Sequence, residues 1–208
     1  MTQLLTPRLR LEPFDDSHLA GLHALNSDPE VMRYLSGHPE SLEETQAGID
    51  RVKQRWKQWG YSWWSFFERS TGELVGAGCI QHLGKDQTQP LEIGWRLRRD
   101  RWGQGLASEA ARRMARFAFD YLAAPDLTAV CVPENLNSAQ VMQRLGMRLR
   151  GTEQWYGSDA TVYGITAQEW TQSPACARAL AEAVPEEDEW AAQAARDAQA
   201  AREQPRFL

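Results

Sequence analysis

A short segment in the middle of the chain has the composition of a phosphate-binding turn. Between a predicted strand and a predicted amphipathic helix the sequence reads Trp102-Gly103-Gln104-Gly105-Leu106-Ala107-Ser108. Glycines let backbone amides approach an anion closely, because they carry no Cβ. The first turn of a helix adds unpaired N–H groups and the positive end of the helix dipole. The segment therefore predicts a pyrophosphate site at the start of the helix.

The local charge agrees with an anionic ligand. Seven arginines and two acids lie between Arg96 and Arg116, although the formal net charge of the chain is −5. We expect the guanidinium groups of this segment to surround the pyrophosphate. The overall acidic balance argues against a nucleic-acid binder that relies on bulk positive charge.

Two other nucleotide sites fit this turn poorly. A dinucleotide-binding turn needs Gly or Ala three places after Gly105, where the sequence has Ser108. Its acidic ribose ligand would be Asp126, which lies in a Pro-Asp turn before a strand and not at a strand's end. A P-loop needs a Gly-Lys-Ser/Thr sequence, which the segment lacks. A nucleotide-dependent oxidoreductase is therefore disfavoured.

The pattern of apolar residues predicts the elements that hold this turn. Alternating, β-branched or aromatic runs predict strands at residues 9–13, 61–67, 74–80, 91–97, 127–132, 147–154 and 160–166. Helical spacing and capping residues predict helices at 15–26, after Asp28-Pro29, and at 41–59, 105–122 and 137–145. This order predicts a mixed α/β (α+β) domain around one sheet.

The last part of the chain differs in composition. Residues 173–208 hold 12 alanines, seven acids and four arginines. We expect one or two helices, broken at Pro185, and an apolar face of alanines that buries little area. The predicted organisation is a domain at 1–172 and an alanine-rich, acidic helical extension at 173–208.

Cysteine and histidine usage predicts no metal site. Cys79, Cys131 and Cys176 are widely spaced, and the four histidines form no metal-binding motif. Cys131 lies in an apolar run, which favours a buried structural thiol over a nucleophile. No apolar run reaches about 18 residues, and the N-terminus has no signal-peptide pattern, so we expect a cytoplasmic protein that contacts no membrane.

The turn resembles a known family. Trp102-Gly103-Gln104-Gly105-Leu106-Ala107 is similar to the pyrophosphate loop of the GCN5-related N-acetyltransferases, Gln/Arg-x-x-Gly-x-Gly/Ala. Trp in the Gln/Arg position resembles the branch that acetylates the N-termini of ribosomal proteins. Further matches in chain order are Thr6-Pro7-Arg8-Leu9-Arg10-Leu11, Glu92-Ile93-Gly94-Trp95, Asn135-Leu136-Asn137-Ser138 and Leu145-Gly146-Met147. The resemblance covers about residues 6–170.

The resemblance implies a fold and a coenzyme. The fold would have a twisted, mostly antiparallel central sheet of about six or seven strands, splayed between the fourth and fifth strands and flanked by helices. Acetyl-CoA would be the co-substrate, with no metal, and the acceptor a small-molecule or peptide amine. The enzyme would be a monomer or a homodimer. The implied coenzyme contacts are Trp95, Arg96, Leu97, Trp102, Gly103, Gln104, Gly105, Leu106, Ala107, Ser108, Asn135 and Ser138.

The same resemblance suggests how the amine is acetylated. Glu92 is the candidate base, acting directly or through water; the alternative is a surface glutamate on the other face of its strand. Ser138 is the second candidate catalytic residue, near the coenzyme sulfur. Many relatives carry a tyrosine acid near the position of Met142, which cannot donate a proton. An acyl-CoA-binding sensor or scaffold without turnover is therefore the alternative function.

An aromatic acceptor pocket is the last expectation. The chain has nine tryptophans, and such side chains bind apolar groups or a cationic amine. The candidates under the early helices and the last hairpin are Trp56, Trp59, Trp63, Trp64, Trp155 and Tyr156. Ordinary core packing is the alternative for each.

Overall fold

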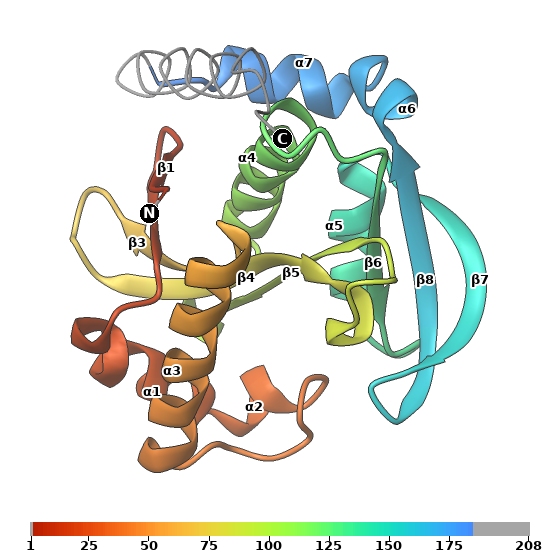
Figure 1. The fold of residues 1–208 in the computed structure, drawn as a ribbon. Coiled ribbons are helices and arrows are strands. Elements are labelled where there is room, and N and C mark those ends of the chain that lie inside the picture. The colour runs from red at the N-terminus through yellow and green to blue at the C-terminus, as the bar shows by residue number, and fades with distance from the viewer. Residues whose placement is uncertain (1, 185–208) are drawn as a thin grey trace, which may run out of the picture.

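The computed structural model describes residues 2–184. Within this range the chain forms a single sheet of eight strands, with helices on both faces (Figure 1). The strands are β1 (Leu4–Leu5), β2 (Leu9–Pro13), β3 (Trp63–Glu68), β4 (Leu74–His82), β5 (Leu91–Leu97), β6 (Asp126–Cys131), β7 (Arg148–Trp155) and β8 (Ser158–Thr166). The α-helices are α1 (Leu19–Asn26), α2 (Pro29–Met32), α3 (Leu42–Trp59), α4 (Leu106–Asp120), α5 (Leu136–Arg144), α6 (Ala167–Thr171) and α7 (Pro174–Ala181).

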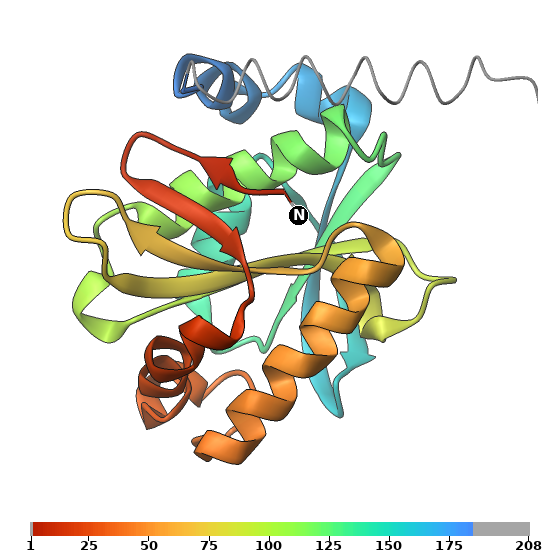
Figure 2. The same cartoon turned by 60° about the vertical axis from the view of Figure 1, so that its left-hand side comes forward.

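The predicted mixed fold is confirmed, with one more strand than expected. The strand order is β1-β2-β3-β4-β5-β6-β8-β7, and neighbours are antiparallel except β5 and β6. The additional strand, β1, has two residues, which is too short for an alternating pattern to appear in the sequence. Figure 2 shows α4 above the sheet and α1, α2 and α3 below it.

The sheet opens between β5 and β6. These parallel strands pair only at Leu91 opposite Leu127 and at Glu92 opposite Thr128. The rest of β5, from Ile93 to Leu97, pairs with β4 on its other edge and has no ladder partner on the β6 side. This is the splay between the fourth and fifth strands that the resemblance implied, because β1 raises each strand number by one.

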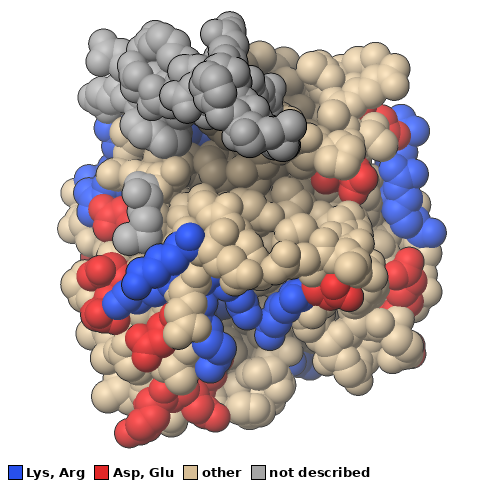
Figure 3. All heavy atoms as spheres, in the orientation of Figure 1, with Lys and Arg blue, Asp and Glu red and all other residues tan. Residues whose placement is uncertain are grey.

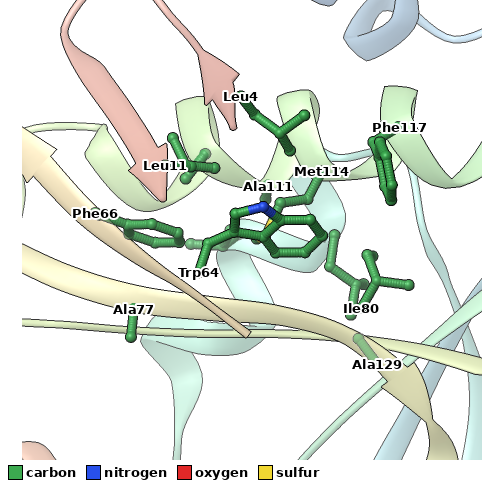
Figure 4. Packing of buried hydrophobic residues seen from close by; sticks show 14 of the residues in the cluster. Leu4, Leu11, Trp64, Phe66, Ala77, Ile80, Ala111, Met114, Phe117 and Ala129 are labelled. Carbon is green, nitrogen blue, oxygen red and sulfur yellow. The ribbon is translucent and has the colours of Figure 1, made fainter. Parts of the chain in front are cut away.

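Helix α4 packs its predicted apolar face against the sheet. Met114 is fully buried and Phe117 nearly so, and Trp64 of β3 meets the Phe117 ring edge-on at 5.4 Å. Figure 4 shows Trp64 at the centre of this packing, between the sheet and α4, with Leu4 and Leu11 close by. Burial of these large side chains stabilises the position of α4 and therefore of the turn at its start.

The glycines of β4 allow this close approach. A Cβ on Gly78 would lie 2.5 Å from Phe66 Cζ and 2.8 Å from both the Gly94 carbonyl oxygen and Met114 Cε. We expect Gly78→Ala to lower the free energy of unfolding by about 3 kcal/mol, because the added methyl overpacks the core.

Urea denaturation checks this prediction against a glycine in open space. A Cβ on Gly48 of α3 would meet only Arg51 Nη2, at 3.8 Å. Gly48→Ala should raise stability by about 0.5–1 kcal/mol, since alanine favours the helix. Equal effects of the two substitutions would contradict the packing argument.

The chain beyond the last strand continues on the outside of α4. Helix α7 begins at Pro174 with Ser173 as its N-cap, and Ala175 and Ala179 are buried. The division after residue 172 stays a prediction, but the first helix of the predicted extension packs against α4. The expected break at Pro185 lies outside the described residues.

Candidate active site

The turn before α4 presents free backbone amides. Gly103 and Gly105 have φ angles of 72° and 78°, a left-handed conformation that glycine adopts without strain. Gly105 is the N-cap of α4 and no side chain caps this helix in the part of the chain described. A Cβ on Gly103 would meet no atom within 4 Å. The exposed amides of the first helical turn and the helix dipole therefore suit a diphosphate.

A buried carboxylate fastens this turn to the start of β2. Glu109 Oε2 accepts from Arg8 Nε at 2.7 Å and pairs with Arg8 Nη2 at 2.6 Å, while Oε1 accepts from Thr6 Oγ1 at 2.6 Å. Arg8 Nη1 donates to the Gln104 carbonyl at 2.9 Å. Arg8 thus reaches the turn with its orientation fixed by Glu109. Local sequence patterns do not reveal this contact, because Arg8 and Glu109 are 101 residues apart in the chain.

We expect Glu109→Gln to loosen the turn. The substitution leaves Arg8 without a charged partner and lowers the free energy of unfolding by about 1.5–3 kcal/mol, the range for hydrogen bonds to charged groups. It should also weaken binding of coenzyme A. Urea denaturation and titration calorimetry measure the two effects. Glu134→Gln, at an exposed position, should change the stability by less than about 0.5 kcal/mol; equal losses would contradict the role of Glu109.

The turn, the open edge of β5 and α5 line one cleft of about 1350 Å³. All predicted coenzyme contacts lie in its wall: Trp95, Arg96, Leu97, Trp102, Gly103, Gln104, Gly105, Leu106, Ala107, Ser108, Asn135 and Ser138. The far wall comes from α2 and the residues after it, Tyr34 and Leu35 among them. The predicted base, Glu92, does not line the cleft.

The arginines around the cleft differ from the expected set. Of the seven arginines near the turn, only Arg96, Arg101 and Arg112 line it. The helical period turns others away, and Arg116 pairs with Asp120 at 3.2 Å. Four further arginines enter the cleft wall from other parts of the chain: Arg8, Arg33, Arg144 and Arg178.

Two of these arginines share one carboxylate at the α7 side of the cleft. Arg112 Nη2 lies 2.8 Å from Glu182 Oε2, and Arg178 Nε lies 2.8 Å from Glu182 Oε1. Because Arg112 is buried, its charge needs a partner, and the Glu182 carboxylate provides one. The segment after α7 therefore contributes to the cleft wall, which its alanine-rich composition did not indicate.

Glu92 lies in a buried hydrogen-bond network beside the gap. Its Oε2 accepts from Gln81 Nε2 at 3.0 Å and from the Tyr156 hydroxyl at 2.5 Å. Gln81 Oε1 in turn accepts from Trp63 Nε1 at 3.1 Å. Glu92 is only 7% exposed, so the surface alternative is wrong. Burial raises the pKa of Glu92, and the hydrogen bonds from Tyr156 and Gln81 offset part of that rise.

The two candidates on α5 lie at its start. Asn135 is the N-cap, and its side chain accepts from Ser138 N at 3.2 Å. Met142, at the position of the relatives' tyrosine acid, is 1% exposed and does not line the cleft. Cys131 is a buried free thiol whose pKa is raised by burial, so it is a poor nucleophile.

The six aromatic candidates for the acceptor pocket lie outside the cleft. Trp56 and Trp64 belong to the core, and Trp59 packs on Tyr61 and His82. Trp63 and Tyr156 belong to the Glu92 network, and Trp155 packs near Gly84. None of the six lines the cleft, whose aromatic side chains are Trp95, Trp102 and Tyr34.

Residues 2–184 were also considered for metal-binding clusters, membrane-spanning helices and basic patches, which other functions would need. No group of three or more His, Cys, Asp or Glu side chains in this range could hold a metal ion. No helix in the same range has the length and apolarity to cross a membrane. On the face seen in Figure 3, the Lys and Arg side chains are interspersed with Asp and Glu and form no continuous basic patch.

Comparisons with known proteins identify the family. The model of the acetyltransferase (GNAT) domain matches residues 8–148. An uncharacterized protein of Bacillus subtilis, YkkB, is 32% identical over 164 residues, which cover 78% of this chain and 94% of the relative. The FsC-acetyl coenzyme A-N(2)-transacetylase of Aspergillus fumigatus is 29% identical over 195 residues, covering 84% and 81%.

A solved structure has the same fold. The ribosomal L7/L12 alpha-N-protein acetyltransferase RimL, in complex with coenzyme A, superposes with a TM-score of 0.68. Its sequence is 20% identical, and the match covers 79% of this chain and 98% of RimL. With the family model matching more than half of its residues, this chain belongs to the GCN5-related N-acetyltransferase family and is an N-acetyltransferase.

Proposed function

We propose that the protein transfers the acetyl group of acetyl-CoA to a primary amine by direct attack in a ternary complex. The observation that carries this proposal is the uncapped start of α4, which lies in the same cleft as the unpaired edge of β5. An anion site and an open strand edge are what a pyrophosphate joined to an extended amide-containing arm requires. The coenzyme A complex of RimL, which has the same fold, supports the assignment.

Different residues would bind different parts of the coenzyme. The amides of Gly103, Gly105 and the first turn of α4 would hold the pyrophosphate, with Arg8 adding positive charge at the Gln104 carbonyl. The backbone of Trp95–Leu97 would pair with the pantetheine arm along the open edge of β5. Asn135 and Ser138 would contact the same arm from α5. When bound, the coenzyme supplies an activated acetyl thioester.

The remaining residues handle the protons. A primary amine with a lysine-like pKa is protonated at neutral pH and must lose one proton before its nitrogen can attack. Glu92, with its raised pKa, is the proposed base. Because Glu92 lies outside the cleft wall, the proton would reach it through water.

Bond formation is then balanced by loss of the thiol. The nitrogen bonds to the acetyl carbon, the carbon–sulfur bond breaks, and the amine's second proton neutralises the departing thiolate. Amides of β5 on the open edge would stabilise the oxyanion; one such donor is worth about 10²–10³ in rate in other acyl-transfer enzymes. Ser138 would orient the sulfur.

Thiol release tests this proposal. The full-length protein, acetyl-CoA and a panel of amines should release free coenzyme A in proportion to the acetylated amine formed, detected by a thiol reagent and by mass spectrometry. The panel should contain peptides, polyamines, aminoglycosides and free amino acids. NADPH should not bind in a parallel calorimetric titration. Coenzyme A binding without acetyl transfer to any of these amines would contradict the catalytic proposal.

A further inference from the structure

The side chain of Arg96 has no role in the reaction proposed above. Its Nε is buried and makes no hydrogen bond, and no carboxylate among the described residues lies within ion-pair distance of it. Its guanidinium lies over the Trp63 ring, 4.6 Å from the ring centroid. Glu40 exerts only a through-space attraction on it, and Glu40 itself accepts a hydrogen bond from Asn26 at 2.8 Å.

An unpaired, partly buried guanidinium is costly unless an anion completes the site. Arginine stays charged under all ordinary conditions, so burial without a counter-ion is not relieved by deprotonation. Desolvation is the main influence on the pKa of Arg96 and lowers it. The Trp63 ring holds the planar group in a fixed orientation, which favours two-pronged recognition of a carboxylate. Arg96 also lines the cleft, so a ligand can reach it.

The pleat of the sheet separates Arg96 from the pyrophosphate turn. Arg96 pairs with Ala77 and Gly94 with Cys79, and a Cβ on Gly94 would meet Cys79 Sγ at 3.3 Å. Successive side chains alternate between faces. Leu97 therefore points to the opposite face, where it lies beside the Cβ position of Gly76 and near Phe66. Arg96 shares its face with Glu92 and Trp63, away from α4, so its ligand is not the pyrophosphate.

Arg96 and Glu92 stand on either side of Gly94. Each is two residues from Gly94 along β5, or about 6.6 Å along the strand. Gly94 leaves the strand surface between them without a side chain. Trp63 contacts both residues. Its ring packs against the Arg96 guanidinium, and its Nε1 donates to Gln81, which in turn donates to Glu92. A cation and a base thus lie on one face of the strand whose edge would hold the thioester.

We propose that the acceptor is a small amino acid-like molecule, whose carboxylate binds Arg96 while its amine is acetylated at the open edge of β5. This inference rests on the proposed function and narrows its substrate class. The amine would lose its proton toward Glu92, and the carboxylate a few bonds away would form paired hydrogen bonds with the guanidinium. Polyamines have no carboxylate that could pair with Arg96, and the same holds for peptide N-termini without a nearby carboxylate.

The test compares acceptors that differ only in the carboxylate. The twenty L-amino acids and their α-carboxamides are assayed with acetyl-CoA by thiol release. With the preferred side chain, the free acid should exceed the carboxamide in kcat/KM about 10- to 100-fold, the range of a charge-assisted pair. Arg96→Gln, which keeps a planar amide over Trp63, should remove that preference, whereas Arg96→Lys should retain part of it.

Binding without turnover separates this inference from the catalytic proposal. The same amino acids are titrated calorimetrically into the protein saturated with coenzyme A, which lacks the acetyl group. Binding that Arg96→Gln abolishes supports the inference, even if no acetyl transfer occurs. Equal rates for acids and carboxamides would overturn it, as would transfer to carboxylate-free amines alone, although acetyl transfer itself would stand.

Discussion

Gly105→Glu is expected to abolish coenzyme A binding while the chain stays folded. The added carboxylate would stand at the N-cap of α4, where the helix dipole and free amides favour an anion. A Cβ at Gly105 would lie 3.6 Å from Arg8 Nη2, so the new carboxylate could pair with Arg8 and occupy the place of the pyrophosphate. We expect the Kd for coenzyme A, measured by calorimetry, to rise at least about 100-fold.

Gly105→Gln is the matched control for this experiment. It imposes the same left-handed strain, about 1–2 kcal/mol for a residue with a Cβ, and nearly the same volume, without the charge. Both variants should therefore stay folded, the glutamate variant with an equal or higher melting temperature because its carboxylate caps α4, while the glutamine variant loses less than about 10-fold in affinity. Unchanged affinity in a folded Gly105→Glu protein would remove the pyrophosphate site from α4.

Glu92→Gln is expected to reduce kcat/KM by about 10²- to 10³-fold at neutral pH, the usual contribution of a general base. Burial raises the pKa of Glu92, and only the carboxylate above that pKa can take a proton. The wild-type rate should therefore rise with pH through this pKa, and the variant should lack that limb. The ratio of the two rates should be largest on the acidic side of the amine's pKa and shrink above it, where free amine needs no base.

Glu92→Gln should not lower the stability of the protein at neutral pH, although it lowers the rate. The folded-state pKa of Glu92 is raised, so the stabilisation from this group is complete at low pH and is lost as the pH rises through that pKa. At neutral pH the buried charge is therefore a cost, and Glu92→Gln should have an equal or higher Tm.

Equal pH–rate profiles for the wild-type and Glu92→Gln proteins would exclude Glu92 from the mechanism.

Tyr156→Phe provides a second measurement of the same group. The Tyr156 hydroxyl donates to Glu92 and lowers its pKa. Removing that donor should move the acidic limb of the pH–rate profile to higher pH without abolishing activity at alkaline pH. A loss of rate that is uniform across the pH range would instead indicate a structural role for Tyr156.

Local sequence patterns predicted much of the fold because helix caps, turns and apolar faces depend on interactions between residues that are close in the chain. The capping box of Ser41 and Glu44 begins α3, and Gly60 in a left-handed conformation ends it, as predicted. The apolar stripe of α4 packs on the sheet, and the two glycines before it adopt positive φ angles. These features depend on neighbours within a few residues, so composition and spacing reveal them.

The contacts that join distant segments around the cleft could not be predicted in the same way. Glu109 and Arg8 are 101 residues apart, and Tyr34 reaches the cleft from the turn after α2. The nine tryptophans suggested a pocket, yet their rings serve the core and the Glu92 network. Whether a tryptophan packs inside or lines a cleft depends on the strands and helices beside it, which the local pattern does not specify.

The sequence by itself determined most of the elements, their order and the glycine turn before α4, because those depend on backbone conformation and helical or strand periodicity. Only the tertiary structure decided which charges are compensated. Folding buried Glu92 against Tyr156, paired Arg112 with Glu182, and placed Arg96 on Trp63 with no carboxylate of residues 2–184 in ion-pair distance. Burial and pairing set the energy of a charge, and both arise from contacts between segments that are distant in the chain.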